Sequence, residues 1–374
     1  MNITYTSELV EKERQRQIPL AKAIESGFSD GVVIYGAGFV GTWASDYLNS
    51  MGAKVLKFID RDEHKHGIGK NGIPVVGPSP QEFRDVPAMF IAARHAIRSV
   101  MEIVGPYDLT AISFDGYFVL RNYERLVRIR ENYLSDSRSI EVFNALLMSM
   151  LTGDTSPCRD VMEKDMYFCL PEFSGNFEET FVDAGAFVGD TVERFIWENL
   201  GTFRHLHAFE PGYKQFQALE RRTERLMMEW GINTDAISLV RAGLGDVTGR
   251  MACTYLDDFP LRHGLSNMEP NATTGKEDRQ NAPVMTLDDY LDGKPVSFLK
   301  ADVEGMEMEL LRGAEKTIRT FRPKMALCVY HYPSHLYEIA EFVRGLIPEY
   351  KFSLRQHAPI FGDFVLYCYT EQNN

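Results

Sequence analysis

The chain has 374 residues, of which 40 are basic and 53 acidic, so its formal net charge is −13. This length exceeds what one hydrophobic core usually serves and predicts two domains. With 44% hydrophobic and 25% charged residues, the composition is that of a globular protein and excludes a disordered or membrane-embedded chain. The negative charge predicts no nucleic-acid partner, because binding to a phosphate backbone needs clustered Lys and Arg.

Cysteine usage and the N-terminus suggest a location. The five cysteines form no C-x-x-C pair, which predicts neither a zinc site nor a redox dithiol and favours a reducing compartment. The N-terminus lacks the apolar core of a signal peptide, and no stretch reaches the ~18 to 20 apolar residues of a membrane span. We therefore expect a cytoplasmic protein without a membrane span.

The first recognisable unit spans residues 31–60, GVVIYGAGFVGTWASDYLNSMGAKVLKFID. It has the order strand, glycine turn, helix, strand. Gly36, Gly38 and Gly41 fit G-x-G-x-x-G directly after the predicted strand Val32–Tyr35, and Asp60 ends the next strand 19 residues past Gly41. This pattern is typical of a dinucleotide site. The following residues, 67–80, show no catalytic set, so a structural or substrate-presenting module remains an equal alternative.

The second unit repeats this order over residues 181–211, FVDAGAFVGDTVERFIWENLGTFRHLHAFEP. Asp183 ends a predicted strand, Gly185 and Gly189 flank the turn, and Asp190 opens the helix. Glu210 closes the next strand, 21 residues after Gly189, where a carboxylate can accept ribose hydroxyl hydrogens. Acidic groups repel a pyrophosphate but attract the ammonium and sulfonium of S-adenosylmethionine, so the turn favours that cofactor over NAD. Alternatively, the two aspartates merely cap the turn and the helix.

Further strands are predicted at 236–240, 297–301, 325–330 and 364–369, with helices between them. This alternation predicts a mainly parallel sheet with helices on both faces. Residues 121–170 show helical periodicity with a turn-rich patch, and we expect a helical connector over residues 121–160. Leu256–Gln280 is rich in Asp, Asn, Gly, Pro and Thr and is expected to be a long loop, either a lid or an ordinary variable excursion.

Several blocks in the second half resemble the FkbM family of methyltransferases across roughly residues 165–370. The blocks are FVDAGAFVGDT (181–191), AFEP (208–211), TLDDYL (286–291), FLKADVEGMEMELLRGA (298–314) and CVYHYPSHLYEI (328–339). Their order and spacing together carry the resemblance. It implies a class I methyltransferase fold, S-adenosylmethionine as the methyl donor, and an oxygen acceptor on a sugar, a lipid-linked glycan or a natural product.

The resemblance also implies roles for single residues of the donor site. Asp183, Gly185 and Gly189 correspond to the loop at the methionine end of the donor, and Glu210 corresponds to the ribose ligand. Asp246, in AGLGD, is similar to an acidic position near the adenine, although Gly245-Asp246 also suits a plain turn. The expected donor-binding set is Asp183, Gly185, Phe187, Gly189, Asp190, Thr191, Glu210, Asp246 and Asp302.

Catalytic candidates follow two later predicted strands. Asp302 and Glu304 come at the end of 297–301, where parallel sheets place ligands, and Asp302 is expected to orient the donor methyl or the acceptor. Glu304 instead could only cap the helix predicted from Met306 to Ile318. His331 follows 325–329 and is the expected general base, with a structural histidine as the alternative.

Tyr330 either hydrogen-bonds the acceptor or packs. Tyr330-His331 stands where many relatives carry Glu-x-His, which leaves the base open between Asp302 and His331. His331, His335 and Glu338 do not predict a metal site, because Pro333 interrupts a helix between the histidines.

These observations predict an α/β protein with a class I methyltransferase Rossmann-like sheet, preceded by a smaller Rossmann-like α/β domain. Expected limits are 1–120 for the front domain, 121–160 for the connector and 161–374 for the methyltransferase domain. The predicted function is S-adenosylmethionine-dependent O-methylation of a small-molecule or glycan hydroxyl. The alternative is an NAD(P)-dependent oxidoreductase or a nucleotide-sugar-binding protein that uses the front domain and a nucleotide bound there. The sequence does not predict an oligomeric state.

Overall fold

The computed structural model describes residues 4–69, 72–84, 86–107, 109–255, 263–266 and 280–371. Residue contacts divide the chain into two compact units. The first unit runs up to Met162 and includes two later segments, Tyr330–Tyr337 and Leu354–Phe364. The second unit comprises Glu163–Val329, Glu338–Ser353 and the residues from Val365 on. The three domains expected from the sequence, 1–120, 121–160 and 161–374, are not tested by this division and remain a prediction.

The first unit contains a six-stranded sheet in the order β3-β4-β2-β1-β5-β6. Its strands are β1 (Val32–Tyr35), β2 (Val55–Ile59), β3 (Gly67–Ile68), β4 (Pro74–Val76), β5 (Ala88–Ile91) and β6 (Thr110–Ser113). Neighbouring strands from β4 to β6 are parallel, and only β3 runs antiparallel to its neighbour. The strand order reverses at β1, so the turn after β1 lies at a topological switch point.

The three glycines of the front motif have separate structural reasons. Gly36 adopts φ +105°, which strains any L-residue. A Cβ on Gly41 would lie 1.8 Å from the Gly36 carbonyl oxygen, because α2 (Phe39–Ser50) packs tightly against the turn. Gly38 has open space around it, with nothing within 4 Å of an added Cβ. Two of the three glycines are therefore required by the local backbone and packing.

Helices flank this sheet in the first unit. They are α1 (Ser7–Ser26), α2, α3 (Ile97–Val104), α4 (Phe114–Asn132), α5 (Ser137–Thr152) and α6 (Ser156–Asp160). Helix α5 is capped at both ends by residues suited to that place. Asp136 at its N-cap accepts a hydrogen bond from the Ser139 N–H at 2.8 Å, and Gly153 at its C-cap adopts φ +68°. Helices α4, α5 and α6 cover most of the expected connector.

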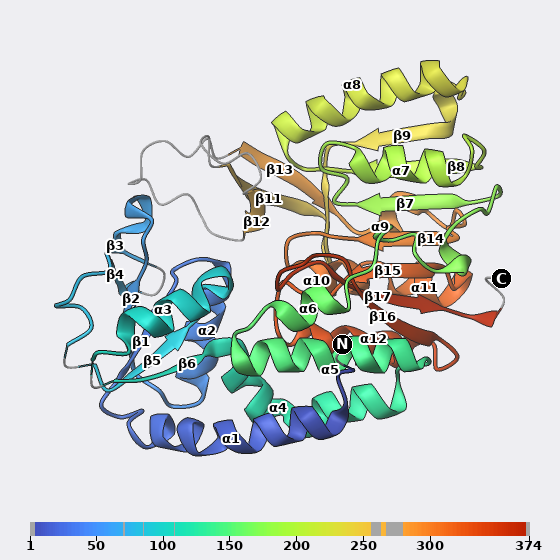
Figure 1. Ribbon diagram of the computed structural model, residues 1–374. Helices are drawn as coiled ribbons and strands as arrows, with labels where there is room; N and C mark the ends of the chain where they lie inside the picture. Colours follow the sequence, from blue (N-terminus) through green and yellow to red (C-terminus); the bar gives the residue numbers. More distant parts are fainter. Residues whose placement is uncertain are drawn as a thin grey trace. The chain divides into compact units, whose positions relative to one another are not determined.

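The second unit contains a seven-stranded sheet in the order β16-β17-β15-β14-β7-β8-β9. The strands are β7 (Thr180–Ala184), β8 (His205–Phe209), β9 (Ile237–Val240), β14 (Phe298–Ala301), β15 (Lys324–Cys328), β16 (Lys351–Gln356) and β17 (Phe364–Tyr369). In Figure 1 they follow one another from β9 at the top to β16 at the bottom. The pairs from β9 to β15 are parallel, and β17 is antiparallel to β15. The order reverses at β7, which places a second switch point at the second glycine turn.

Six α-helices lie between these strands in the described part of the second unit. They are α7 (Asp190–Glu198), α8 (Tyr213–Trp230), α9 (Leu287–Leu291), α10 (Glu307–Arg312), α11 (Glu315–Phe321) and α12 (His335–Leu346), the last of which begins in the first unit, together with a 3-10 turn at Pro171–Phe173. The helix predicted from Met306 to Ile318 is divided at Gly313-Ala314 into α10 and α11. A Cβ on Gly313 would lie 1.9 Å from the Gly245 carbonyl oxygen, so only glycine fits at position 313, where the chain packs against the loop at Gly245.

A small sheet with the order β10-β13-β11-β12 completes the second unit. Its strands are β10 (Gly243–Leu244), β11 (Gly249–Tyr255), β12 (His263–Ser266) and β13 (Gln280–Met285). The expected loop Leu256–Gln280 is wrong for His263–Ser266, because these residues pair antiparallel with β11, from Ala252↔Ser266 to Tyr255↔His263. The remaining part of that predicted loop lies outside the described residues, apart from Gln280 in β13.

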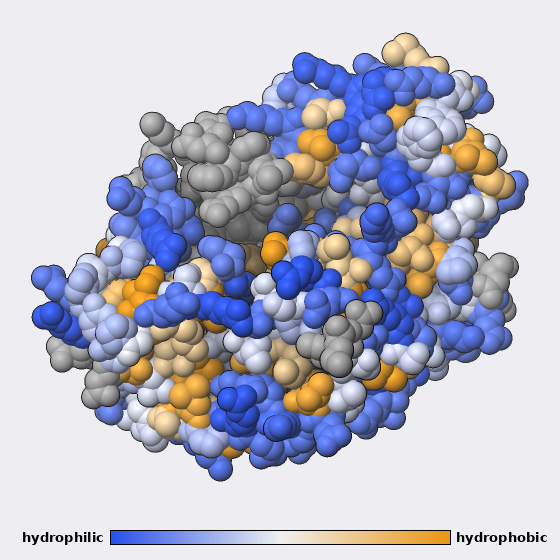
Figure 2. All heavy atoms as spheres, in the orientation of Figure 1, coloured by the Kyte–Doolittle hydropathy of each residue, from blue (hydrophilic) through white to orange (hydrophobic). Residues whose placement is uncertain are grey.

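Polar side chains cover most of the face shown in Figure 2, as the charged composition leads one to expect. Among the described residues, no helix is both long and apolar enough to cross a bilayer. The interior of the second unit is aromatic at its centre: Phe181 lies 4.4 Å from Phe195 and 4.6 Å from Phe298 between ring centroids, and all three are fully buried. This core holds β7 and β14 rigidly in the middle of the sheet.

Candidate active site

The second glycine turn follows β7 and has an unusual backbone. Gly185 and Gly189 adopt φ +82° and +84°, and Phe187 adopts φ +47°. The N–H groups of Gly185 and Ala186 both donate to the Phe209 carbonyl, at 3.0 and 2.8 Å, which ties the turn to the end of β8. The turn is thus held in one conformation by its glycines and by the neighbouring strand.

Gly185 also passes very close to the chain after β14. A Cβ at this position would lie 1.8 Å from the Asp302 carbonyl oxygen, so no other residue fits without moving the backbone. The Asp302 N–H in turn donates to the Ala184 carbonyl at 3.0 Å. The glycine turn and Asp302 are therefore adjacent, as expected for residues at the carboxyl ends of neighbouring parallel strands.

A buried ion pair lies beneath the turn. Lys300 of β14 is in register with Asp183 of β7, and its Nζ lies 2.9 Å from Asp183 Oδ1, with both side chains almost entirely buried. The same Nζ donates to the Gly185 carbonyl at 2.7 Å and to the Ala184 carbonyl at 3.3 Å. Burial alone would lower the pKa of Lys300, but the Asp183 and Asp302 carboxylates outweigh it and raise that pKa, so the amine stays charged.

This pair corrects the electrostatic argument made from the sequence. Asp183 does not present its charge to a ligand, because Lys300 balances it inside the protein. Nor does Asp183 cap a helix. Asp190 is exposed in the first turn of α7, where a carboxylate favours the helix dipole, while Thr191 beside it is buried. Of the two aspartates, only Asp190 offers an exposed carboxylate that could repel a pyrophosphate or attract a cationic donor.

Glu210 is a buried carboxylate beside the glycine turn. It follows β8, is 1% exposed, and its carboxylate holds the glycine turn: Oε2 accepts from the Phe187 N–H at 3.0 Å and Oε1 from the Gly212 N–H at 2.6 Å. A Cβ on Gly212 would lie 2.6 Å from Glu210 Oε1, which explains the bare residue after Pro211. Asp246 is exposed in the loop after β10 and does not follow β9 directly.

Asp302 is the second carboxylate at this sheet edge. Its Oδ2 accepts a hydrogen bond from the Tyr167 hydroxyl at 2.9 Å, and the Tyr167 ring lies 5.2 Å from Lys300 Nζ. Asp183, Lys300, Tyr167 and Asp302 thus form a connected set of contacts within the second unit.

The turn after Asp302 differs from the sequence expectation. Strand β14 ends at Ala301, so Asp302 and Glu304 do not share a strand face. Glu304 is exposed with φ +55°, and α10 begins only at Glu307 without a side-chain cap at its N-cap residue Met306, so the alternative that Glu304 caps this helix is wrong. Glu307 takes that role instead, since its Oε1 accepts from the N–H groups of Val303 at 3.0 Å and Gly305 at 3.4 Å.

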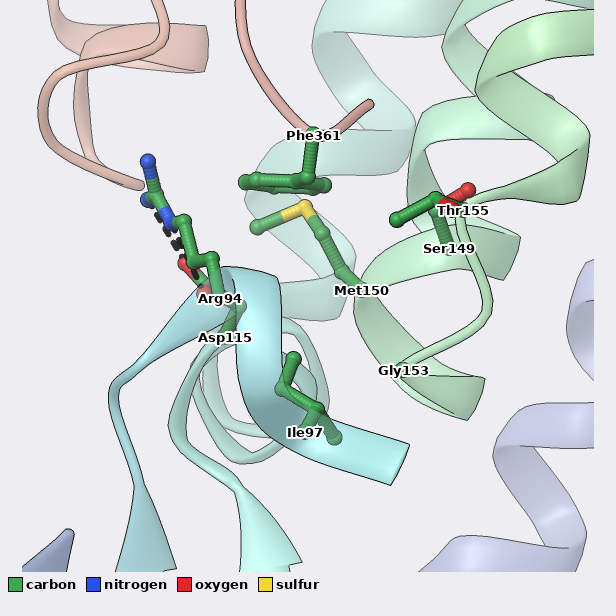
Figure 3. Close-up of a pocket in the computed structure, with 8 residues that line it drawn as sticks. All are labelled: Arg94, Ile97, Asp115, Ser149, Met150, Gly153, Thr155 and Phe361. Atoms are coloured by element: carbon green, nitrogen blue, oxygen red, sulfur yellow. Dashed lines mark hydrogen bonds and ion pairs between the residues drawn. The ribbon is translucent and has the colours of Figure 1, made fainter. Parts of the chain in front are cut away.

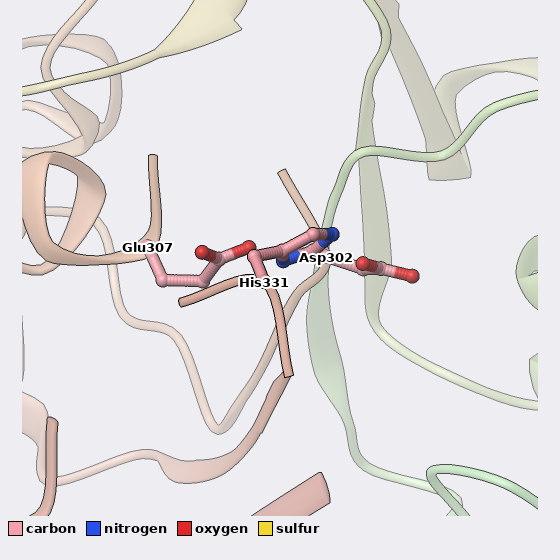
Figure 4. A group of neighbouring side chains, drawn as sticks. All are labelled: Asp302, Glu307 and His331. Carbon is pink, nitrogen blue, oxygen red and sulfur yellow. The ribbon is translucent and has the colours of Figure 1, made fainter. Parts of the chain in front are cut away.

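His331 and Tyr330 follow β15 by three and two residues and belong to the first unit by their contacts. Their rings lie 4.2 Å apart between centroids, and the Tyr330 ring is 6.0 Å from Phe364, so Tyr330 packs against its neighbours. His331 is 7% exposed. Figure 4 draws His331 together with Asp302 and Glu307, the carboxylates on either side of the turn after β14.

The front glycine turn has a similar carboxylate. Asp60 Oδ2 accepts from the Ala37 N–H at 2.7 Å and lies 3.1 Å from Lys65 Nζ, and Oδ1 accepts from the Asp62 N–H at 2.9 Å. Burial would raise the pKa of Asp60, but these backbone and lysine contacts outweigh it and lower that pKa. Asp60 thus occupies the same place beside its turn as Glu210 does in the second unit.

Three residues of the second unit escaped the sequence analysis: Lys300, Tyr167 and Glu307. Lys300 had a detectable signature, because a lysine inside the apolar run Ser297–Ala301 is rarely buried without a partner. Tyr167 had none, since it lies in an irregular segment with φ +71°.

Comparison with known proteins agrees with this geometry. Residues 183–354 match the model of the methyltransferase FkbM domain, and this match supports methyltransferase activity. The match supports S-adenosylmethionine as the donor. No curated protein matches the chain.

Solved structures agree on the fold. The chain is similar to the methyltransferase FkbM from Methylobacillus flagellatus KT, with 18% identity, a TM-score of 0.59, and coverage of 97% of this chain and 98% of that one. Aeropyrum pernix fibrillarin with natively bound S-adenosyl-L-methionine is more distant, with 12% identity, a TM-score of 0.32, and coverage of 57% and 72%. The first of these comparisons confirms the expected α/β fold of the class I methyltransferases.

The buried pair leads to a prediction about stability and pH. In Lys300→Met, Asp183 keeps its buried position without a counter-charge, and the free energy of unfolding at pH 7 is expected to fall by about 3–5 kcal/mol. Burial raises the folded-state pKa of Asp183. Protonation of Asp183 at lower pH therefore stabilises the folded variant, and its loss of unfolding free energy relative to wild type should shrink as pH falls towards 5. Urea unfolding at both pH values measures this.

The double variant Lys300→Met/Asp183→Asn is the matched control and should recover most of the lost stability, because it removes both charges. A Lys300→Met loss that is independent of pH, or that the second substitution leaves unchanged, contradicts the assignment.

Proposed function

We propose that this protein transfers the methyl group of S-adenosylmethionine to a hydroxyl oxygen of a sugar, a glycan or a natural product. The observation that supports this most is the arrangement at the switch point of the second unit. A rigid glycine turn and two carboxylates, Glu210 and Asp302, gather at the carboxyl ends of β7, β8 and β14. The FkbM family match covers the same residues.

The donor set suits S-adenosylmethionine chemically. Backbone groups of Gly185–Gly189 and the exposed carboxylate of Asp190 suit the amino-acid end, and Glu210 suits the ribose hydroxyls. Phe187 and Thr191 belong to the same turn. Asp246, exposed after β10, is the proposed group nearest the adenine. When bound, S-adenosylmethionine supplies an electrophilic methyl carbon on a sulfonium, which is the driving force of the reaction.

The protein's own residues then have two tasks. The first is to hold the acceptor oxygen in line with the methyl group, for which Asp302 is the proposed orienting group, itself fixed by the Tyr167 hydroxyl. The second is to accept the proton of the hydroxyl as it reacts, because an alcohol is a weak nucleophile. His331 is the proposed base, since an imidazole exchanges protons near neutral pH. Tyr330 packs beside it.

A small-molecule or glycan acceptor remains preferred over nucleic acid because of the net charge of −13. One observation favours a second candidate function, in which the first unit binds a nucleotide: the space beside Gly38 at the start of α2 is open. The Asp60 carboxylate accepts hydrogen bonds from the turn beside it, as the Glu210 carboxylate does, so these contacts do not separate the two sites. Titration of the purified protein with NADH tests this second candidate: binding supports a nucleotide site in the first unit, and no binding counts against it.

The two corresponding carboxylates provide a matched test of the donor site. Glu210→Gln should weaken binding of S-adenosylhomocysteine by about 10- to 100-fold, as expected for a lost hydrogen bond to a charged group. Asp60→Asn, the same change at the corresponding place of the front unit, should leave the Kd within twofold of wild type. Isothermal titration calorimetry measures both. Weaker binding in Asp60→Asn with normal binding in Glu210→Gln would place the donor in the front unit instead.

Transfer itself is tested with tritiated-methyl S-adenosylmethionine and a panel of methyl glycosides, nucleoside diphosphate sugars and lipid-free glycans. His331→Gln should lower kcat on the best acceptor by about 10² to 10⁴, the range of a lost general base, with the donor Kd unchanged. Asp302→Asn should instead raise the KM of donor or acceptor. If His331→Gln retains full kcat and Asp302→Asn abolishes it, Asp302 is the base and the assignment made here is wrong.

A further inference from the structure

The segment Tyr330–Tyr337 carries the proposed base and makes its contacts with the first unit, although it follows β15 of the second unit in the chain. Its neighbours in the first unit come from four places in the sequence: the turn after β5, the helix α2, the helix α4 and the segment Leu354–Phe364. None of these contacts is explained by methyl-donor binding, and each can be followed residue by residue.

Arg94 makes the first of these contacts. It lies in the short turn after β5 and forms a two-pronged pair with Asp115 at the start of α4, with Nε at 3.0 Å from Oδ2 and Nη2 at 2.8 Å from Oδ1 (Figure 3). Asp115 is 1% exposed. Such a fork fixes the plane of the guanidinium, so its remaining N–H groups point in a defined direction.

The free side of the guanidinium faces the segment. Arg94 Nη1 donates to the Tyr330 carbonyl at 2.5 Å, and the Phe361 ring lies 4.5 Å from the guanidinium carbon. Phe361 in turn lies 5.2 Å from Phe364, which packs on the Tyr330 ring. The peptide that precedes His331 is therefore held at its carbonyl by a charge-assisted hydrogen bond.

Tyr332, on the other side of His331, contacts the front glycine motif. Its ring lies 4.5 Å from that of Phe39 and 5.6 Å from that of Trp43, and both belong to α2. Phe39 is the fourth residue of GAGFVG and the first of the helix. The position that follows the glycine turn is thus covered by an aromatic ring of the segment.

Tyr337 provides the last contact, where α12 has begun. Its ring stacks on Phe118 of α4 at 6.0 Å with an interplanar angle of 10°, and the Arg125 guanidinium carbon lies 3.8 Å from the ring centroid. Contacts are therefore made by the residue before His331, by the residue after it, and by Tyr337, six residues beyond His331.

We infer that the first unit positions His331 by holding the segment Tyr330–Tyr337, with Arg94 as the positioning residue and α2 as the platform for Tyr332. The inference rests on the proposed function, in which His331 is the base. The first unit then has a role in catalysis, because the helix that follows its glycine motif forms the surface on which Tyr332 packs. Lysine cannot replace Arg94, because one ammonium cannot form the fork with Asp115 and also reach the Tyr330 carbonyl in a fixed direction.

The experiment compares Arg94→Lys and Phe39→Ala with Arg98→Ala. Arg98 is the matched control because it also forms an ion pair in the first unit, with Asp154 at 2.6 Å, but its side chain is 66% exposed and it is not among the contacts of the segment described above. Phe39 is 47% exposed, so its truncation should not compromise folding. The readouts are hydrogen–deuterium exchange of peptides covering 329–337, the Kd of S-adenosylhomocysteine, and kcat on the best acceptor of the panel.

Arg94→Lys should speed exchange in 329–337 and lower kcat about 10- to 100-fold, since small displacements of a catalytic group are costly, with the Kd within twofold of wild type. Phe39→Ala should also speed exchange in 329–337 and lower kcat, but to a smaller extent, and Arg98→Ala should change neither quantity. In a His331→Gln background, Arg94→Lys should cost nothing more, because both changes act through one residue.

Unchanged exchange in Arg94→Lys, or a loss of kcat that adds fully to that of His331→Gln, overturns the positioning role. Full activity of His331→Gln instead overturns the proposed base while exchange still reports whether Arg94 holds the segment. The two failures are therefore distinguishable.

Discussion

The ion pair between Lys300 and Asp183 is the constraint on which the second unit's site depends. It joins the two central strands at the point where the strand order reverses, and the lysine also binds the carbonyl of Gly185. Placing two charges away from water is costly, and the cost is offset only when attraction and additional hydrogen bonds are well aligned. Here the backbone carbonyls of the turn are those additional acceptors, so the energetics of the pair and the shape of the turn are linked.

The two glycine turns of the chain show how similar sequences acquire different interiors. In both, a carboxylate at the end of the next strand accepts from an N–H of the turn, Glu210 from Phe187 and Asp60 from Ala37. The position of the buried pair differs. In the first unit the corresponding residue of β1 is Ile34, which is in register with Phe90, and both are fully buried. Among the described residues, the front turn therefore has no buried ion pair beneath it and is held by packing and by hydrogen bonds such as that from the Ala37 N–H to Asp60.

This contrast bears on the role of each unit. A turn whose carbonyls are bound by a buried lysine keeps its geometry when a polar ligand with its own charges arrives. The front turn lacks that support and instead carries Phe39, whose ring meets Tyr332. This contrast agrees with our proposals that the second unit binds the donor and that contacts within the first unit hold the segment Tyr330–Tyr337.

Much of this could be predicted from the sequence because glycine turns, strand ends and apolar periodicity are local. The positions of Gly185, Gly189 and Glu210 at one sheet edge follow from a single βαβ unit. The charge state of the turn could not be predicted, because the partner of Asp183 lies 117 residues away and becomes its neighbour only through the register Lys300↔Asp183.

The same limit applies to irregular segments. Tyr167 reaches Asp302 from a stretch with positive φ, which no periodicity reveals. Strand β12 escaped because its residues are stabilised by pairing with β11 and not by a pattern of their own. Non-local pairing decided each of these cases.

The most direct test of the account is a crystal structure of the protein grown with S-adenosylhomocysteine. The account predicts the amino-acid end of the ligand against Gly185–Gly189, its ribose hydroxyls at the Glu210 carboxylate, and Lys300 still paired with Asp183. A ligand seated at the Gly36–Gly41 turn, or a second glycine turn filled by the protein's own side chains, would contradict it.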